Sequence, residues 1–117
     1  MLLDWKNYRN QLLARVSDLG KLTPGTLKGY QALGAAGEQT GHLDAKTREL
    51  IALACSVTAR CDGCITVHTE AAARHGATRD EVAETLGVAI ALGAGAALVY
   101  SARTLDAFNA HSGAGGV

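Results

Sequence analysis

The chain has 117 residues, which is enough for one domain with its own hydrophobic core. Lys and Arg residues balance Asp and Glu residues at 11 each, so the charge gives no reason to expect binding to nucleic acid or to an anionic membrane. Aromatic residues make up only 4%, and glycine and alanine are abundant, a composition that suits closely packed helices better than sheets. Three cysteines, an odd number, argue against the disulfide framework of a secreted protein and for a cytoplasmic chain with reactive or metal-binding thiols.

The N-terminal sequence "MLLDWKNYRN" places Asp4 before any apolar run can build, so no signal peptide is expected. The first predicted helix follows directly, in "DWKNYRNQLLARVSDLGKL". Apolar residues recur there at steps of three and four, which predicts one apolar stripe along a helix: Trp5, Tyr8, Leu12, Val16 and Leu19.

A second helix is predicted to begin at Thr23-Pro24, because threonine is a common N-cap and proline fits the first helical position. It is expected to run to about Ala36 and to be broken by "GEQTGH", residues 37–42. Asp44 then caps a third helix over residues 45–59, "AKTRELIALACSVTA". Apolar residues occur on most faces of this segment, so a central, buried helix is expected.

The stretch "RCDGC" is predicted to be a short turn that leads into a fourth helix, which ends at His75-Gly76 with the glycine as the stop. Residues 78–81, "TRDE", form a capping box that starts a fifth helix. The run Gly93-Ala94-Gly95 is expected to bend this helix or to divide it from a sixth one. The prediction is therefore an all-α domain of about six helices over residues 1–110, with a disordered tail at 111–117.

An apolar stretch, "LGVAIALGAGAALVY" at residues 86–100, is the one segment that raises the question of a membrane. It has 15 residues, whereas a membrane-spanning helix needs about 20. A buried helix or a subunit interface is the expected role of this stretch. A soluble chain without membrane insertion follows.

Two cysteines and a histidine of the fourth helix are predicted to share one face. At 100° per residue, Cys64 lies about 300° and His68 about 340° beyond Cys61 around the helix. A cysteine pair at this spacing can close a small disulfide ring, and a helix N-terminus stabilises a thiolate. His68, one turn beyond Cys64, could accept its proton directly or through a water. These residue types are the components of a dithiol redox centre.

Glu49 is the one carboxylate in the mostly apolar third helix. If it points inward, it should be paired or have a raised pKa, as a proton shuttle requires. If it points outward, it would pair with a Lys or Arg on the surface. Periodicity alone leaves both arrangements open.

The spacing of these residues resembles a known family. Glu49, eleven intervening residues, the pair Cys61-x-x-Cys64, three further residues and His68 are similar to the signature of the alkylhydroperoxidase AhpD-like family, within the carboxymuconolactone decarboxylase superfamily. The flanking sequence resembles it too, from about Leu43 to Arg103.

This resemblance implies a helical, oligomeric protein, a homotrimer or homohexamer, that reduces hydroperoxides with its cysteine pair. It implies that Cys64 attacks the peroxide, that Cys61 resolves the sulfenic acid into a redox-active disulfide, and that Glu49 and His68 form a water-assisted proton relay. No other cofactor is implied. The partners would be a small hydroperoxide and a dithiol or protein reductant, with no nucleic acid and no membrane. Helix electrostatics alone would instead favour Cys61 as the more acidic thiol.

One position departs from the family pattern. The best-known AhpD proteins have a histidine directly before the second cysteine, and Gly63 occupies that position in this chain. One member of the relay is therefore absent, which bears on peroxidase efficiency and on the choice of electron donor. His42 or His75 could take its place only if the fold brings one of them close.

Two other interpretations of the cysteines are open. Cys61, Cys64 and His68 could bind zinc, with Glu49, His42 or His75 as the fourth ligand, although they lie closer together than in common structural sites. The same residues could instead be ordinary buried core, as Cys55 is expected to be. The sequence thus predicts a thiol-dependent hydroperoxide reductase. The alternative is a zinc-binding or redox-sensing assembly protein without turnover. The decarboxylase branch of the superfamily, which lacks the cysteine pair, fits less well.

Overall fold

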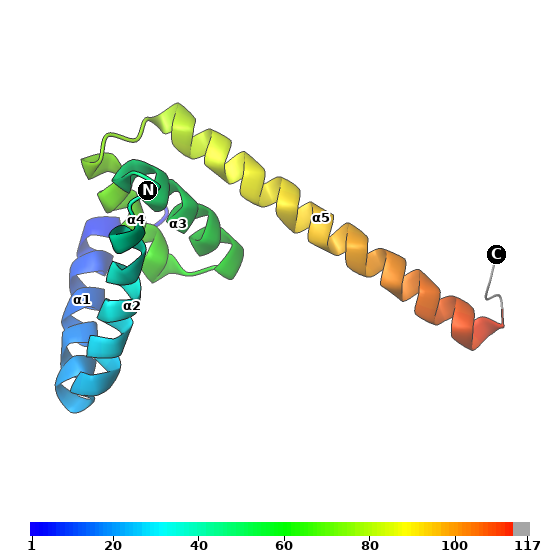
Figure 1. The fold of residues 1–117 in the computed structure, drawn as a ribbon, viewed down its shortest axis with the longest axis horizontal. Coiled ribbons are helices and arrows are strands. Elements are labelled where there is room, and N and C mark those ends of the chain that lie inside the picture. Colours follow the sequence, from blue (N-terminus) through cyan, green and yellow to red (C-terminus); the bar gives the residue numbers. More distant parts are fainter. Residues whose placement is uncertain (114–117) are drawn as a thin grey trace.

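The computed structural model describes residues 1–113, and within them it consists of helices joined by short turns, with no strand (Figure 1). The predicted all-α class is confirmed. The five helices are α1 (Trp5–Leu22), α2 (Pro24–Thr40), α3 (Ala45–Ala59), α4 (Asp62–Arg74) and α5 (Arg79–Ser112).

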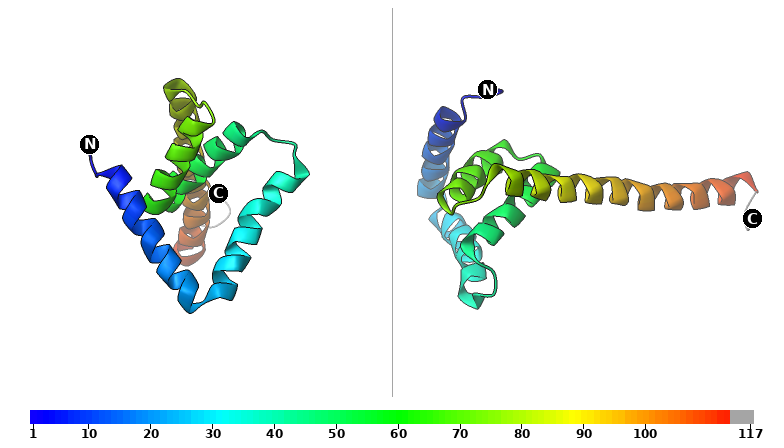
Figure 2. Two further views of the ribbon diagram at one scale, coloured as in Figure 1. Left: turned by 90° about the vertical axis from the view of Figure 1, so that its left-hand side faces the viewer. Right: turned by 90° about the horizontal axis from the view of Figure 1, so that it is seen from above.

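The helices form a small cluster from which α5 projects. Helix α3 packs against both α4 and α5, while α1 packs against α2 and α4. The hairpin of α1 and α2 lies at one end of the molecule, and α5 extends straight away from the cluster in the views of Figures 1 and 2. The central position expected for α3 is confirmed. Its expected burial is only partial, because Leu53 and Ser56 are buried whereas Ile51 and Val57 are exposed.

Helix α1 is fixed along α4 by two polar contacts. The Thr66 hydroxyl donates to the backbone carbonyl of Trp5 at 2.9 Å, and Arg9 lies 3.6 Å from the carboxylate of Glu70. Asp4 caps the helix by accepting from the backbone N–H of Asn7 at 3.2 Å. These contacts hold the apolar stripe of α1 against the cysteine-bearing helix.

The predicted end of α2 at Ala36 is wrong, because the helix continues to Thr40 and stops at Gly41. Gly37 lies within a run of good helix formers, and one interior glycine costs only about 1 kcal/mol relative to alanine. Gly41 has a φ of 67°, the left-handed conformation that ends a helix and that glycine adopts without strain. Position 41, and not 37, is therefore the helix stop.

The turn between α3 and α4 brings the cysteine pair into place. Arg60 has a φ of 55°, and the Cys61 N–H donates to the Ser56 carbonyl at 3.1 Å, which is a helix-ending hydrogen-bond pattern. The chain then becomes extended at Cys61, which is the N-cap of α4. The predicted bounds of α3 are confirmed, with Asp44 accepting from the Thr47 N–H at 2.8 Å.

Helix α5 begins at the predicted capping box but is not divided. The Thr78 hydroxyl accepts from the Glu81 N–H at 3.1 Å, and the Glu81 carboxylate accepts from the Thr78 N–H at 3.0 Å. The expected bend or break at Gly93-Ala94-Gly95 is wrong, because the helix runs through it as one element of 34 residues. Alanine and leucine around the glycines have high helix propensity, and no proline interrupts them.

The C-terminal tail predicted for residues 111–117 is shorter than expected. His111 and Ser112 are the last residues of α5, and Gly113 ends the helix with a φ of 75°. The remaining part of the predicted tail, residues 114–117, lies outside the described residues.

The chain exposes far more surface than a compact monomer. Its accessible area is 9030 Å², against about 6000 Å² expected for a folded monomer of this mass. Its radius of gyration is 19.5 Å, against about 13 Å for a compact domain of this length. Neither α2 nor α5 has a buried residue, and apolar side chains such as Leu98, Val99 and Phe108 are exposed along α5.

By length and composition alone, α5 could cross a membrane. An 18-residue window of it has a mean hydropathy of 1.9, and only 6% of that window is buried. The predicted fifth and sixth helices are one, so the apolar stretch at 86–100 lies within a single helix of 34 residues, which is long enough to span a membrane. Such a helix is weak evidence of a membrane span, since the core helix of a soluble protein has the same composition.

Candidate active site

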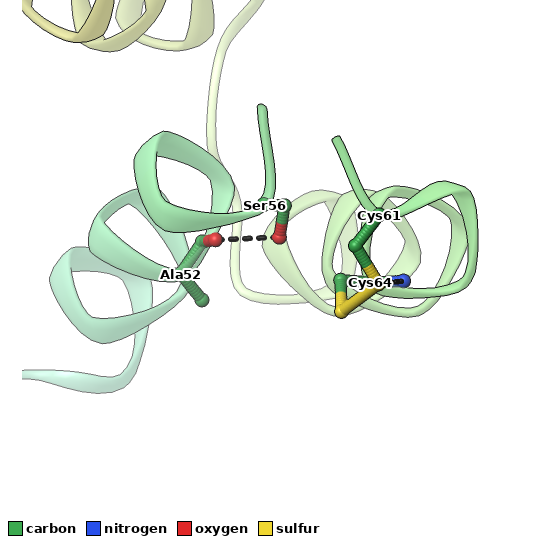
Figure 3. The surroundings of a disulfide bond; sticks show 4 residues. All are labelled: Ala52, Ser56, Cys61 and Cys64. Carbon is green, nitrogen blue, oxygen red and sulfur yellow. Dashed lines mark hydrogen bonds between the residues drawn. A yellow bond between two sulfur atoms is a disulfide. The ribbon is translucent and has the colours of Figure 1, made fainter. Parts of the chain in front are cut away.

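Cys61 and Cys64 are joined by a disulfide at the start of α4 (Figure 3). Their Cα atoms lie 5.2 Å apart, which is a normal separation for a disulfide. Cys61 is the N-cap, and its sulfur accepts a hydrogen bond from the Cys64 N–H at 3.1 Å. The predicted turn and helix start therefore position both sulfurs at one helix N-terminus.

This location favours negative charge on sulfur. The first backbone N–H groups of α4 have no partner within the helix, and the helix dipole adds a partial positive charge at this end. When the disulfide is reduced, the thiol that ionises is stabilised by these groups. The contact from the Cys64 N–H places Cys61 in the direct capping position, and Cys64 lies in the first turn.

Glu49 and His68 form the second part of the site. The Oε2 atom of Glu49 lies 2.7 Å from Nδ1 of His68, and the two side chains are only 23% and 31% exposed. Of the two arrangements that the sequence left open for Glu49, the structure has the inward one, with a histidine and not a surface Lys or Arg as the partner.

The contact between Glu49 and His68 defines what the imidazole can do. A carboxylate at Nδ1 favours the tautomer that carries its proton on Nδ1, and Nε2 is then the atom with a free lone pair. The carboxylate also stabilises the imidazolium that forms when Nε2 takes a proton. His68 can thus accept a proton at Nε2, one helical turn beyond Cys64.

An apolar hollow of about 300 Å³ lies over the disulfide. Three helices line it with apolar side chains, and the disulfide and His68 form the rest of its wall: Leu12, Leu13, Val16, Tyr30, Cys61, Gly63, Cys64, Val67 and His68. The structure therefore brings three of the four predicted site residues to one cavity, and the fourth, Glu49, contacts the His68 ring. The sequence did not predict that α1 and α2 line this hollow, although it placed Leu12 and Val16 correctly on one apolar stripe.

The other histidines and the third cysteine lie elsewhere. His42 and His75 are exposed and do not line the hollow, so neither takes the place of the histidine absent at position 63. The expectation that Cys55 is buried core is wrong. It is an exposed free thiol between α3 and α5, beside Ala54, Val88 and Leu92.

The zinc interpretation finds no ligand set in the described part of the chain. Within residues 1–113, no group of three or more His, Cys, Asp or Glu side chains is arranged to hold a metal ion. Cys61 and Cys64 are bonded to each other, and His68 is engaged with Glu49.

Comparisons with known proteins agree with the fold and with the family resemblance of the sequence. Residues 24–107 match the model of the carboxymuconolactone decarboxylase family. An uncharacterized protein of Haemophilus influenzae is 51% identical over 93% of this chain and 96% of its own length, and one of Cupriavidus necator is 36% identical over 94% and 97%.

Two solved structures share the architecture. A carboxymuconolactone decarboxylase family protein from Legionella pneumophila has a TM-score of 0.72 and 36% identity, covering 90% of this chain and 94% of that one. A protein from Methanobacterium thermoautotrophicum has a TM-score of 0.67 and 32% identity, covering 72% and 94%.

Proposed function

Because this chain belongs to the carboxymuconolactone decarboxylase family, we propose that it is a thiol-dependent alkyl hydroperoxide reductase with Cys61 and Cys64 as its redox pair. One observation carries the proposal: a cysteine pair at a helix N-terminus shares an apolar hollow with His68, whose Nδ1 lies 2.7 Å from the Glu49 carboxylate. That combination supplies a nucleophilic sulfur, a resolving sulfur and an oriented base.

The cycle starts from the reduced pair. His68 Nε2 accepts the Cys64 proton, directly or through a water, and Glu49 stabilises the resulting imidazolium. The Cys64 thiolate attacks the terminal oxygen of the hydroperoxide, the O–O bond breaks, and the alkoxide takes the proton from His68 and leaves as an alcohol. Cys64 is left as a sulfenic acid.

Cys61 then gives its proton to His68, and the Cys61 thiolate attacks the sulfenic sulfur, which forms the S–S bond and breaks the S–O bond. The hydroxide that leaves takes the proton from His68 and is released as water. An external dithiol, from a small molecule or a reductant protein, restores both thiols by exchange and is itself oxidised to a disulfide. Overall, one hydroperoxide and one dithiol give one alcohol, one water and one disulfide. The redox-active disulfide is the only redox group that this cycle requires.

The assignment of Cys64 as the attacking thiol rests on its spacing from His68. The histidine follows Cys64 by one helical turn, and both side chains line the hollow. Cys61, the N-cap, has the better position for a stable thiolate. Such a thiolate suits the resolving step, and it is also a good leaving group when the external dithiol reduces the disulfide. We place the reaction in the cytoplasm, where dithiol reductants are available.

We also propose that the working form is a homo-oligomer, a trimer or hexamer, assembled through α5. The chain exposes about 3000 Å² beyond the roughly 6000 Å² of a compact monomer, whereas an obligate homodimer interface buries about 1000–2500 Å² per chain. Apolar side chains occur on all sides of α5, as in helices that are covered all round. The middle part of α5 has no charged residue, so the same part of α5 in a second copy could pack against it. The small residues around Gly93 permit close contact between the two helices.

Intact-mass measurement tests the proposed chemistry. The metal-free, reduced protein is treated with one equivalent of tert-butyl hydroperoxide, and peptides are mapped. We expect a loss of two hydrogens located at Cys61–Cys64, which a dithiol reverses. The exposed Cys55 is replaced by serine in the test protein, so that it cannot form other disulfides.

Cysteine variants then separate the two roles. Cys64→Ser should abolish turnover, and Cys61→Ser should consume one equivalent of peroxide to reach the sulfenic acid, or two to reach the sulfinic acid, and then stop. If both variants turn over like the parent, the proposal fails. Zinc in the purified protein, together with an unchanged mass after peroxide, would instead support the metal-binding alternative.

A further inference from the structure

We propose that Leu12 of α1 is a specificity-determining residue of the redox site, which selects by size and polarity what reaches Cys61 and Cys64. Leu12 lies outside residues 24–107, the part of the chain that matches the family model. The inference deepens the proposed function and rests on it for the identity of the substrate.

The contact between Leu12 and Gly63 is the observation that leads to this role. A Cβ atom built on Gly63 would lie 2.7 Å from Cδ2 of Leu12, closer than real Cβ contacts approach. The leucine side chain therefore occupies the space that any larger residue between the two cysteines would need. The size of the side chain at position 63 therefore limits the position of Leu12, and the reverse also holds, although the two residues lie on helices far apart in the sequence.

Leu12 is held in this place by the docking of α1. The hydrogen bond from Thr66 to the Trp5 carbonyl, at 2.9 Å, fixes the start of α1 on α4, and Arg9 is 3.6 Å from Glu70 one turn further on. Leu12 follows on the same face of α1, half-buried against the turn that carries the cysteines. The Leu12 side chain therefore has a defined position in the wall of the hollow.

The chemistry of the hollow indicates the kind of substrate. Its lining contains no Asp, Glu, Lys or Arg, and Leu12, Leu13 and Val16 make one side of it apolar. A volume of about 300 Å³ is at the small end of ligand pockets. A hydroperoxide with a compact, uncharged hydrocarbon group would place that group on Leu12 and its peroxide oxygens near the sulfurs and His68.

A double-mutant cycle tests the steric part. Leu12→Ala should lower kcat/KM for cumene hydroperoxide about tenfold, because part of the apolar wall is removed, while kcat/KM for hydrogen peroxide changes less than about twofold. Gly63→Ala alone should also lower the cumene hydroperoxide value, because the new methyl group drives Leu12 into the hollow. In the Leu12→Ala background, Gly63→Ala should have almost no further effect, since the space is free.

A matched control and an independent readout complete the test. Leu19→Ala, on the same helix but away from the hollow, should leave both substrates unaffected. In parallel, alkylation of Cys64 in the reduced protein is followed by peptide mapping with a small reagent, iodoacetamide, and a bulky one, N-phenylmaleimide. Gly63→Ala should change the ratio of the two alkylation rates in the parent protein. It should leave this ratio almost unchanged in the Leu12→Ala background.

The outcomes are distinguishable. If Gly63→Ala has the same effect in the parent protein and in the Leu12→Ala background, or if small and bulky probes respond equally, Leu12 does not determine specificity. If no hydroperoxide is consumed but the alkylation ratios follow the cycle, the peroxidase proposal fails while control of access by Leu12 stands.

Discussion

The contact between Glu49 and His68 makes the strongest prediction at the scale of single residues. His68→Ala removes the base, and Glu49→Gln removes the charge that stabilises the imidazolium. We expect peroxide-dependent oxidation of Cys64 to slow by about 10²–10⁴-fold in each variant near neutral pH. Stopped-flow measurement over pH 6–10 checks this, because the deficit should shrink where the thiol ionises unaided.

His75→Ala is the matched control for the relay. His75 follows the last residue of the same helix and is exposed, so its removal should leave the rate unchanged. A His75 variant as slow as the His68 variant would mean that loss of α4 stability, and not loss of the base, explains the result.

The sequence predicted part of this site and could not predict the rest. Cys61, Cys64 and His68 share one helix, so their arrangement follows from helical spacing. The orientation of Glu49 depends on how α3 packs against α4, and the contact of Leu12 with Gly63 joins two segments that lie far apart in the chain. Periodicity places such residues on one face of a helix, but it does not show which face of another helix packs against it.

At the scale of helices, an ion pair ties the start of α5 to the start of α3. Lys46 Nζ lies 2.8 Å from the carboxylate of Glu81, the residue that also completes the capping box with Thr78. The hydrogen bond with Lys46, followed by those with Thr78, lowers the pKa of Glu81 from 4.5 to about 2. Lys46 in turn has a raised pKa because of the hydrogen bond with Glu81.

The direction of the Glu81 shift gives a prediction about pH. Because the folded-state pKa of Glu81 lies below the unfolded one, its stabilising effect is complete above pH 4.5 and is lost as the pH falls towards about 2. Glu81→Gln should therefore lower the Tm at pH 7 and have no effect near pH 2. The glutamine can still accept the Thr78 N–H, so the variant removes the charge of Glu81 and keeps the capping contact.

Glu84→Gln is the control for that measurement. Glu84 is exposed one turn along α5 and makes no ion pair in the part of the chain that the structure describes. Thermal melts followed by circular dichroism at both pH values give the comparison. A loss of stability in Glu81→Gln that persists at pH 2 would contradict a role for the ion pair.

Helix boundaries show where sequence patterns succeed and where they do not. The starts of α3 and α5 were predicted because Asp44 and Thr78 are local caps whose hydrogen bonds involve only neighbouring residues. The glycines at 37, 93 and 95 were expected to break helices and do not. A glycine only weakens a helix unless the backbone must turn left-handed there, and Gly41 is the position where it does.

At the scale of the whole molecule, the exposed α5 predicts self-association. Light scattering of the purified protein should give a multiple of the 12.0 kDa chain mass, consistent with a trimer or hexamer. Leu98→Asp places a charge in the middle of the uncharged part of α5 and should shift the mass towards one chain. Ala83→Asp, which follows the acidic first turn of α5, is the matched control.

Two results would contradict self-association. The parent protein could give the mass of one chain at all concentrations tested. Alternatively, it could stay with phosphatidylcholine vesicles in a flotation experiment, in which case lipid and not a second copy covers α5.

If copies of this chain cover α5, as we propose, the stability of each chain depends on protein concentration. Folding and encounter become parts of the same equilibrium, so the melting temperature should rise with protein concentration and fall on dilution. Helix α5 packs on α3, the helix that carries Glu49, so in the proposed oligomer neighbouring copies would also stabilise the position of Glu49 beside His68. Protein concentration would then regulate the redox centre directly. At low concentration the site would be poorly ordered, and at high concentration it would be stably formed.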